Sequence, residues 1–233
     1  MFITNPLSSL DHTNISKIRT FNQTNLMRVH SVITGDIVNS TKLLPAAEKK
    51  LLHNLNGILQ PYKFEFYRGD SFQVYLEDGK AALQLALLCR TTALSLDPEE
   101  NTPISDIRVG IGLGQVEGPV NTPGSAKGEA FVLSGRSFDN LEKSDDRLII
   151  TAANDLANAG LLVISDYVNV IFRELTAKQA EVIVELLKGH TQQETADKLQ
   201  KSKSTIHQHV SAGRWNEIAR ILHHYEKITE QLS

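Results

Sequence analysis

The sequence predicts an α+β domain followed by an all-α segment. Short runs of β-branched and aromatic residues recur between residues 31 and 151, and stretches with helical apolar spacing separate them. After residue 175 only helical patterns occur. Hydrophobic residues make up 41% and charged residues 22% of the chain, which is typical of a folded globular protein and excludes a disordered one.

The α+β part is expected to run in the order β-α-β-β-α-β-α-β. Strands are predicted at 31–36, 64–67, 72–76, 106–112 and 147–151, and helices at 46–59, 79–93 and 130–141. Pro45 suits the first turn of a helix, and residues 68–71 (Arg-Gly-Asp-Ser) suit a hairpin turn that carries a carboxylate. This order indicates a ferredoxin-like sandwich with its helices on one face of the sheet.

The chain is predicted to divide into four parts. They are a polar N-terminal arm (1–28), the α+β domain (29–152), a connecting helix (153–174) and an all-α domain (175–233). The arm is rich in Asn, Ser and Thr, and a mis-assigned start codon is an alternative explanation for it. The connecting helix has apolar positions on two faces, so it could contact a partner subunit or the same chain.

Composition also predicts a cytoplasmic protein with no membrane segment. The only cysteine, Cys89, lies in an apolar run and is expected in the core, which fits a reducing compartment. The N-terminus lacks the basic and apolar regions of a signal peptide. The longest apolar run, around 161–164, is too short to span a bilayer.

The C-terminal segment carries the signals of three capped helices. Capping boxes occur at 176–179 and at 191–194, and Gly189 lies where the first helix should end. Ser202 caps a third helix, which is expected to continue through Trp215. Two short helices joined by a tight turn predict a helix-turn-helix.

The third helix has the polar surface that DNA reading requires. Basic residues concentrate in 198–214, and since the whole chain carries a net charge of −3, any DNA contact must be local. The alternative is a three-helix bundle with no nucleic-acid role. The predicted DNA-binding residues are Gln192, Lys201, Ser202, Lys203, Ser204, Thr205, Gln208, His209 and Arg214.

Two Gly-Asp pairs predict a ligand site in the α+β domain. Asp36 and Asp70 end neighbouring predicted strands, so together they could bind Mg²⁺, while the backbone of 37–41 could hold a polyphosphate. The alternative is that both aspartates cap turns. The predicted cation ligands are Asp36, Ile37 and Asp70, and the predicted phosphate or ligand contacts are Val38, Asn39, Ser40, Thr41, Phe66 and Arg68.

Two resemblances bear on these sites. The stretch from Leu175 to Val210 resembles the helix-turn-helix of sigma-factor region 4 and LuxR-type regulators. The strings VITGDIVNSTKL, RGDSFQVYL, IRVGIGLGQVEG and GEAFVLSGRSFDNL resemble the signatures of class III nucleotidyl cyclases, and most of the chain is similar to the SatD-type family, which joins both modules. The resemblance implies a cyclase-like fold and dimers with sites at the interface.

Carried over residue by residue, the resemblance places Asp36 and Asp70 at the metal-binding aspartates of cyclases. It also makes Arg136 the catalytic residue that stabilises charge on the transferred phosphate. Val132 replaces the expected asparagine, and Phe66 replaces the lysine that reads the purine. A site that cannot hydrogen-bond the base loses purine selectivity.

The sequence therefore predicts a homodimeric, DNA-binding transcriptional regulator. Its degenerate cyclase-like domain is expected to sense a nucleotide or another phospholigand rather than to act as an enzyme. One alternative is an active, Mg²⁺- or Mn²⁺-dependent nucleotidyl cyclase with an attached DNA-binding domain. A dimerisation scaffold without a ligand is a further alternative.

Overall fold

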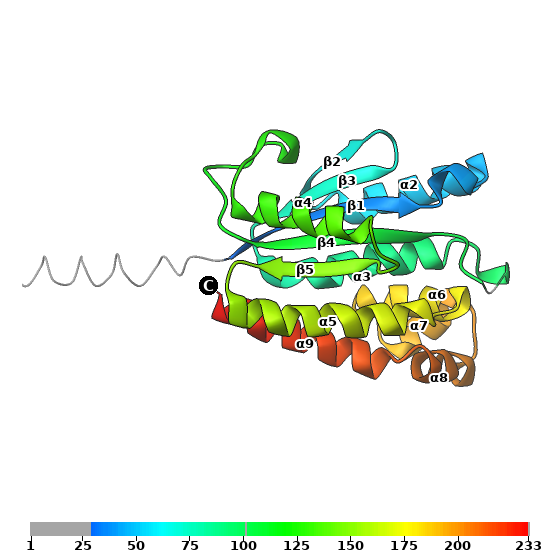
Figure 1. Ribbon diagram of the computed structural model, residues 1–233. Helices are drawn as coiled ribbons and strands as arrows, with labels where there is room; N and C mark the ends of the chain where they lie inside the picture. The colour runs from blue at the N-terminus through cyan, green and yellow to red at the C-terminus, as the bar shows by residue number, and fades with distance from the viewer. Residues whose placement is uncertain (1–28, 101, 233) are drawn as a thin grey trace, which may run out of the picture.

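The computed structural model describes residues 29–100 and 102–232, so the predicted arm, 1–28, lies outside the described residues. Within them the chain forms a five-stranded sheet and eight helices, which confirms the α+β class (Figure 1). The strands are β1 (His30–Val38), β2 (Lys63–Tyr67), β3 (Ser71–Leu76), β4 (Asp106–Gly114) and β5 (Leu148–Ala152). The helices are α2 (Pro45–Leu59), α3 (Ala82–Leu94), α4 (Glu129–Leu141), α5 (Asp155–Arg173), α6 (Ala177–Leu187), α7 (Gln192–Leu199), α8 (Lys203–Ala212) and α9 (Trp215–Gln231).

The sheet has the strand order β2-β3-β1-β4-β5. β1 lies in the centre and pairs antiparallel with both β3 and β4, whereas β5 is added parallel to β4. β2 and β3 form the predicted hairpin, with Arg68 and Gly69 at positive φ in the turn. The predicted order of strands and helices from residue 29 to residue 152 is thus confirmed.

Helices cover both faces of the sheet, so the expectation of helices on one face is wrong for α4. α2 and α3 lie on one side, and α4 lies on the other, over β4, β1 and β5 (Figure 1). The cause is the alternation in β4: Ile111 and Leu113 point into the main core, while Gly110 and Gly112 present bare backbone to α4. The backbone of α4 comes so close that a Cβ at Gly110 would lie 2.6 Å from the Ser134 carbonyl oxygen.

One hydrophobic core joins the sheet to the C-terminal helices. It includes Leu83 and Leu87 of α3, Ile183 of α6 and Ile221 of α9, together with the inward residues of the strands. Tyr225 of α9 is fully buried and donates a hydrogen bond of 2.7 Å to the Gly79 carbonyl oxygen. The α6–α9 segment therefore packs against α3. Cys89 is buried, as predicted.

A buried ion pair adds to this core. Arg90 of α3 is 1% exposed and donates two hydrogen bonds, of 3.1 and 2.7 Å, to the carboxylate of Asp106 at the start of β4. Its guanidinium also lies 4.6 Å from the centre of the Phe172 ring in α5. One side chain thereby connects α3, β4 and α5.

α5 closes the free edge of the sheet. Ser165 accepts a hydrogen bond from the Ile150 amide (3.0 Å) and Asn158 accepts one from the Ala152 amide (3.2 Å). Asn169 donates to the Leu148 carbonyl oxygen (2.9 Å). Among the described residues, α5 is the one helix long and apolar enough to cross a membrane, by length and composition only. Its polar side chains show a different use, because they satisfy the backbone of an edge strand.

The close approach of α4 to β4 gives a stability prediction. We expect Gly110→Ala to lower the free energy of unfolding by about 2–3 kcal/mol, because the new Cβ would meet backbone atoms of α4 that cannot turn aside. The matched control is Gly57→Ala in α2, where no atom lies within 4 Å of the added Cβ and a gain of about 0.5–1 kcal/mol is expected. Urea unfolding of both variants measures the difference, and equal midpoints would contradict it.

Candidate functional site

Asp36 and Arg108 form a charged pair on the sheet face that α4 partly covers. The two residues are opposite each other in the β1–β4 register, and Arg108 donates bonds of 2.9 and 2.5 Å to the two carboxylate oxygens of Asp36. The side chains are 14% and 24% exposed. Hydrogen bonding to Asp36 raises the pKa of Arg108, against the opposing effect of partial burial, so the guanidinium stays charged.

A row of polar side chains continues this face. The Gln73 side-chain amide donates to the Thr34 hydroxyl (3.2 Å), which lies 3.1 Å from the Ser134 hydroxyl of α4. Ser71 lies opposite Asp36 in the β1–β3 register. Residues opposite each other in antiparallel strands point to the same side. The face therefore presents carboxylate, guanidinium, hydroxyl and amide groups together.

Asp70 lies at the edge of this face, beside the turn that follows β1. Its backbone carbonyl accepts a bond from the Ile37 amide (3.0 Å), and its carboxylate accepts one from the Ser40 hydroxyl (2.8 Å). Asn39 has a φ of 61° and begins a short 3₁₀ turn, Ser40–Lys42. The first amides of such a turn have no partner within it, so they can donate to a ligand. The structure thus brings Asp70 to the predicted phosphate loop.

The two aspartates as arranged do not form a ready site for Mg²⁺. Both oxygens of Asp36 are engaged by Arg108, and Asp70 accepts from Ser40. Across 29–100 and 102–232, no group of three or more His, Cys, Asp or Glu side chains could hold a metal ion. Ile37 points its side chain into the core and uses its amide on Asp70. A divalent cation would have to compete with a guanidinium.

Other residues predicted for the ligand site lie apart from Asp36. Phe66 pairs with Phe72 across the hairpin, with ring centres 5.9 Å apart, on the opposite face of the sheet and against the main core. Arg136 is exposed on the side of α4 that faces away from the sheet. Arg68 is exposed in the hairpin turn, and the Val38 carbonyl accepts a bond from Ser105 (2.9 Å). Thr41 is exposed on the 3₁₀ turn.

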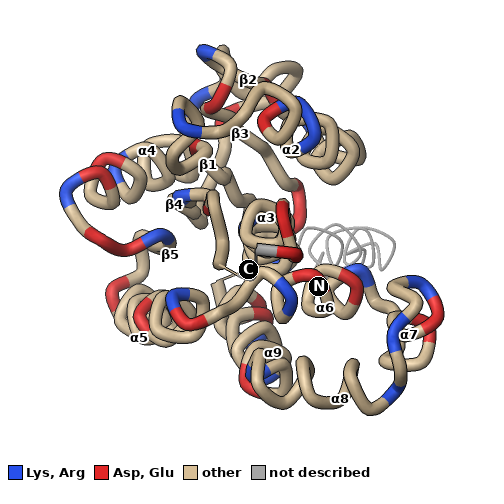
Figure 2. The backbone as a smooth tube through the Cα atoms, turned by 90° about the vertical axis from the view of Figure 1, so that its right-hand side faces the viewer, with Lys and Arg blue, Asp and Glu red and all other residues tan. Residues whose placement is uncertain are grey.

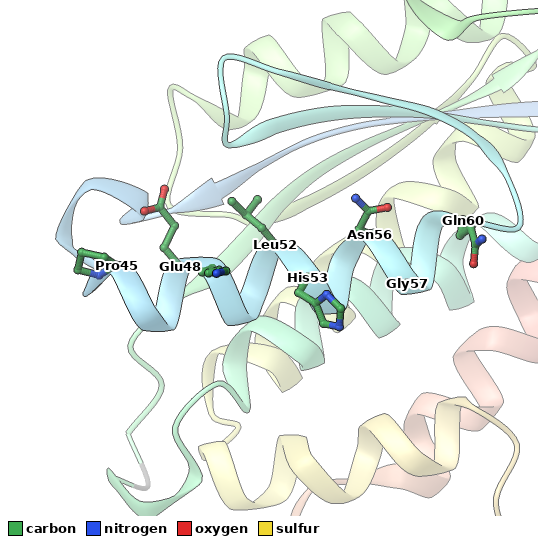
Figure 3. A pocket seen from close by; sticks show the side chains of 8 residues that line it. Pro45, Glu48, Leu52, His53, Asn56, Gly57 and Gln60 are labelled. Carbon is green, nitrogen blue, oxygen red and sulfur yellow. The ribbon is translucent and has the colours of Figure 1, made fainter.

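A hollow of about 680 Å³ lies along α2 (Figure 3). Its described lining comes from that one helix, and the polar members include Glu48, His53 and Asn56. Asp36 and Asp70 are not among the lining residues. We assign no function to this hollow.

The C-terminal helices begin as their sequence predicts. Both capping boxes are present, at 176–179 and 191–194, and Ser202 accepts a bond from the Thr205 amide (3.0 Å). α7 and α8 are joined by residues 200–202, with Gln200 at a φ of 53°. A small core joins α6, α7 and α8, and its buried members are Val182, Leu186, Ala196, Ile206 and Val210. Because one side of α8 is buried in this core, its other side faces outward.

The outward side of α8 is polar. Lys203, Ser204 and Gln208 are exposed, and so is Gln192 at the start of α7. No acidic residue occurs from 198 to 214, whereas four lysines and arginines do. α7 and α8 lie at the corner of the molecule far from β2 (Figure 2). This is the candidate nucleic-acid interface.

Four other predicted DNA contacts are already used or altered within the chain. Lys201 forms an ion pair with Glu181. Arg214 donates to Glu174 (3.1 Å) and lies between α8 and α9, so the expectation that the third helix continues through Trp215 is wrong. Gly213 and the left-handed backbone of Arg214 end that helix. Burial and the nearby Lys201 lower the pKa of His209, and the half-buried Thr205 is part of the cap.

Two residues escaped the sequence prediction. His207 is exposed on the outer face of α8, four residues after Lys203, and helical spacing alone could have identified it. Arg108 was missed because its partner is 72 residues away. The available signal was an arginine two residues after Asp106, in a strand whose remaining residues are apolar or glycine.

The sequence matches no protein-family model and no curated protein. Two solved structures of a bacterial light-regulated adenylyl cyclase are similar to the chain. One is 20% identical in sequence, the match covers 53% of this chain and 76% of the other chain, and the TM-score is 0.40. The other is 16% identical in sequence, the match covers 63% of this chain and 58% of the other chain, and the TM-score is 0.38.

The Asp36–Arg108 pair leads us to predict that a divalent cation stabilises the protein only when Arg108 is replaced. We expect Arg108→Gln to cost about 1–2 kcal/mol of stability, between the values for exposed and buried pairs, since both side chains are partly exposed. Mn²⁺ should raise the melting temperature of this variant but not of the wild type, because only the variant frees the Asp36 oxygens.

Differential scanning fluorimetry with and without Mn²⁺ measures this response. The double variant Asp36→Asn/Arg108→Gln is the control and should not respond, because it lacks the freed carboxylate. An equal rise in the wild type would show that Arg108 does not exclude the cation.

Proposed function

We propose that this chain is a DNA-binding regulator, in which α7 and α8 form a helix-turn-helix and the sheet domain senses a nucleotide or another phosphate-bearing ligand. The observation that carries the proposal is the outward face of α8. It is exposed, polar and free of acidic residues, while its inward face is buried against α6 and α7. A helix with such a surface suits the major groove of DNA.

The residue types on this face divide into two roles. Ser204 and Gln208 offer hydroxyl and amide groups that can read base edges, and Lys203 can neutralise a phosphate. Lys203 begins α8, where the unpaired amides and the helix dipole also favour a phosphate. Gln192 begins α7 and is exposed, so it can contact the backbone of the same DNA.

The ion pairs that hold α7 on α6 also support the proposal. Glu185 of α6 is nearly buried and accepts from Lys188 (3.0 Å) and Lys198 (2.6 Å), and it lies 2.9 Å from His190. Burial raises the pKa of Glu185, but the bonds from Lys198 and Lys188 outweigh it and hold the pKa below its ordinary value. Glu185 therefore stays charged at neutral pH and ties α7 to α6.

Three observations support the sensing role of the sheet domain. The first four strands lie in the order β2-β3-β1-β4, and we propose that they and their helices form a ferredoxin-like βαββαβ unit. The Arg108 guanidinium suits a phosphate group, and the amides of the turn after Asn39 lie at the same end of β1. Mg²⁺ stays part of the proposal only if a ligand releases Asp36 from Arg108.

Sensing is favoured over cyclase chemistry by where the residues lie. Phe66 is on the opposite sheet face from Asp36, Arg136 points away from the sheet, and Asp36 is ion-paired. We expect no cyclic nucleotide from any nucleoside triphosphate with Mg²⁺ or Mn²⁺. Product that disappears in Asp36→Ala would reverse this assignment. We further propose that the protein is a homodimer, because one helix-turn-helix binds DNA weakly. We also propose that it is cytoplasmic.

DNA binding is tested by charge and by side-chain type. We expect Lys203→Ala to weaken binding to any duplex and to reduce the slope of log K against log salt by about 1, because one phosphate contact is lost. Gln208→Ala should cost about 1–3 kcal/mol on a selected sequence and little on random DNA. Fluorescence anisotropy at several salt concentrations measures both.

The matched control is Lys49→Ala, which removes another exposed lysine, from α2. It should leave the affinity and the slope unchanged. Equal losses in Lys49→Ala and Lys203→Ala would mean that the protein binds DNA by diffuse charge and would count against the α8 interface.

A further inference from the structure

α5 carries an exposed apolar stripe that the fold does not use. Leu156, Val163, Tyr167 and Val170 are 86%, 68%, 41% and 47% exposed. Their spacing of seven, four and three residues puts them on one side of the helix. The opposite side of α5 is buried on β5, so the stripe faces out from the domain.

A groove of about 700 Å³ between α5 and α9 extends this stripe. Ile221 and Ile228 of α9 line it together with Val163 and Tyr167. α9 runs antiparallel to α5 (Figure 1), with Ile228 beside Gly160. The two helices therefore form one continuous apolar face.

The two flanks of this face differ in charge. On the α9 flank, Glu217, Arg220, His224 and Lys227 follow one another at helical spacing beside the groove. Glu217 and Arg220 form an ion pair of 3.8 Å, which a partner subunit would have to exchange for new contacts. On the other flank, the exposed charged residues of α5 are Asp155, Asp166 and Arg173. Arg173 also contacts Asp146 at 3.3 Å through an exposed ion pair, which a partner subunit could replace.

Gly160 and Ile228 are in contact and the two helices are antiparallel, so each step forward along α5 corresponds to a step back along α9. Asp166 therefore lies at the same height along the helices as the stretch between Arg220 and His224. Arg173 lies at the height of the start of α9, near Glu217.

We propose that this face binds a second copy of the chain, through a two-fold axis that runs along α5. Such an axis keeps the two α5 helices parallel and exchanges the flanks. Asp166 then faces Arg220 of the partner subunit, and Arg173 faces Glu217 of the partner subunit. An antiparallel pair would instead place the basic flank of α9 against itself, which like charges disfavour.

The size of the face suits a dimer. Two neighbouring helices of this length present a footprint on the order of 500 Å². Two such faces together would bury on the order of 1,000 Å², which is about the lower bound for a specific interface. The apolar stripe lies in the middle and the charges lie at its rim, which is the usual anatomy of such a surface.

The parallel arrangement has a consequence for α8. α9 begins at Trp215, directly after α8, at the end of the face where α5 finishes (Figure 1). A two-fold axis along α5 therefore sets both α8 helices at the same end of the dimer. This part rests on the proposed DNA-binding function, because two symmetric reading helices fit two half-sites of a palindrome. The dimer itself does not depend on that function.

Cysteine cross-linking tests the axis. Burial raises the pKa of Cys89 to about 12, so the native thiol is unreactive and adds little background. With parallel helices, Val163→Cys and Val170→Cys should each form a disulfide-linked dimer on mild oxidation. With antiparallel helices, at least one of these positions would be more than about 10 Å from its copy, beyond disulfide reach. Failure of either variant to cross-link would overturn the parallel dimer.

Charge exchange tests the same contact in the intact protein. Asp166→Arg and Arg220→Asp should each shift the mass seen by light scattering from twice 25.8 kDa towards 25.8 kDa, and the double variant should restore the dimer. Val163→Glu should give a monomer, whereas Val132→Glu, at a site 49% exposed on α4, should not. A monomeric wild type would refute the proposal, as would dissociation by Val132→Glu alone. So would binding of the wild type to anionic lipid vesicles that Val163→Glu abolishes, because the face would then serve a membrane surface.

The two proposals fail differently in one further measurement. A Val163→Glu monomer should keep weak, non-specific DNA binding but lose at least tenfold in affinity for a selected palindrome. If the wild type is a dimer that binds no DNA, the DNA-binding function fails and the interface stands. If the wild type binds DNA as a monomer, the interface fails and the function stands.

Discussion

The buried ion pair between Arg90 and Asp106 is the contact on which the arrangement of all three candidate surfaces depends. A guanidinium that is 1% exposed must keep its partner, since removing one member of a buried pair typically costs 3–5 kcal/mol. Arg90 belongs to α3, on which α6 and α9 pack. Its partner Asp106 begins β4, the strand that also carries Arg108. Phe172, whose ring the Arg90 guanidinium contacts, belongs to α5, the helix with the apolar stripe. The pair thus fixes the α8 surface, the sheet face and the α5 face relative to one another. Eleven of the thirteen residues of α3 are buried, which is typical of a helix enclosed on all sides.

Features that depend on neighbours in sequence could be predicted, and features that depend on distant partners could not. The capping boxes at 176–179 and 191–194 follow from local hydrogen bonds between residues three apart, so the start of α6 and of α7 was read correctly. The strands were recognised by their residue types, but the face on which each side chain lies depends on register. The resemblance to cyclases places Phe66 in the same ligand site as Asp36, whereas the register puts its side chain against the core on the opposite face of the sheet. The end of α8 was missed because Arg214 adopts a left-handed backbone, which is uncommon for a residue other than glycine.

α5 shows how one helix can satisfy two opposing demands. Its inward side offers Ser165 and Asn169, with Asn158 near its start, to the unpaired edge of β5, and an edge strand without such cover is an aggregation hazard. Its outward side is as apolar as a core helix, which explains why its composition is like that of a membrane segment. The same composition is expected when a helix is buried on one side by its own sheet and on the other by a second subunit. The sequence signal, apolar positions on two faces, was correct, but it could not distinguish these partners.

Under the proposed function, the geometry also indicates how a ligand on the sheet could alter DNA binding. Arg108 lies two residues after Asp106 on the same strand, so a phosphate that draws Arg108 from Asp36 acts on a strand anchored to α3 and, through β5, to α5. A ligand can shift such an equilibrium only by its difference in affinity for the two arrangements. A shift in β4 or β5 would reach the proposed dimer face through the Ser165 and Asn169 bonds, and it would reach α8 through the angle between the two subunits. Small displacements suffice in this scheme, since the separation of two reading helices must match one turn of DNA.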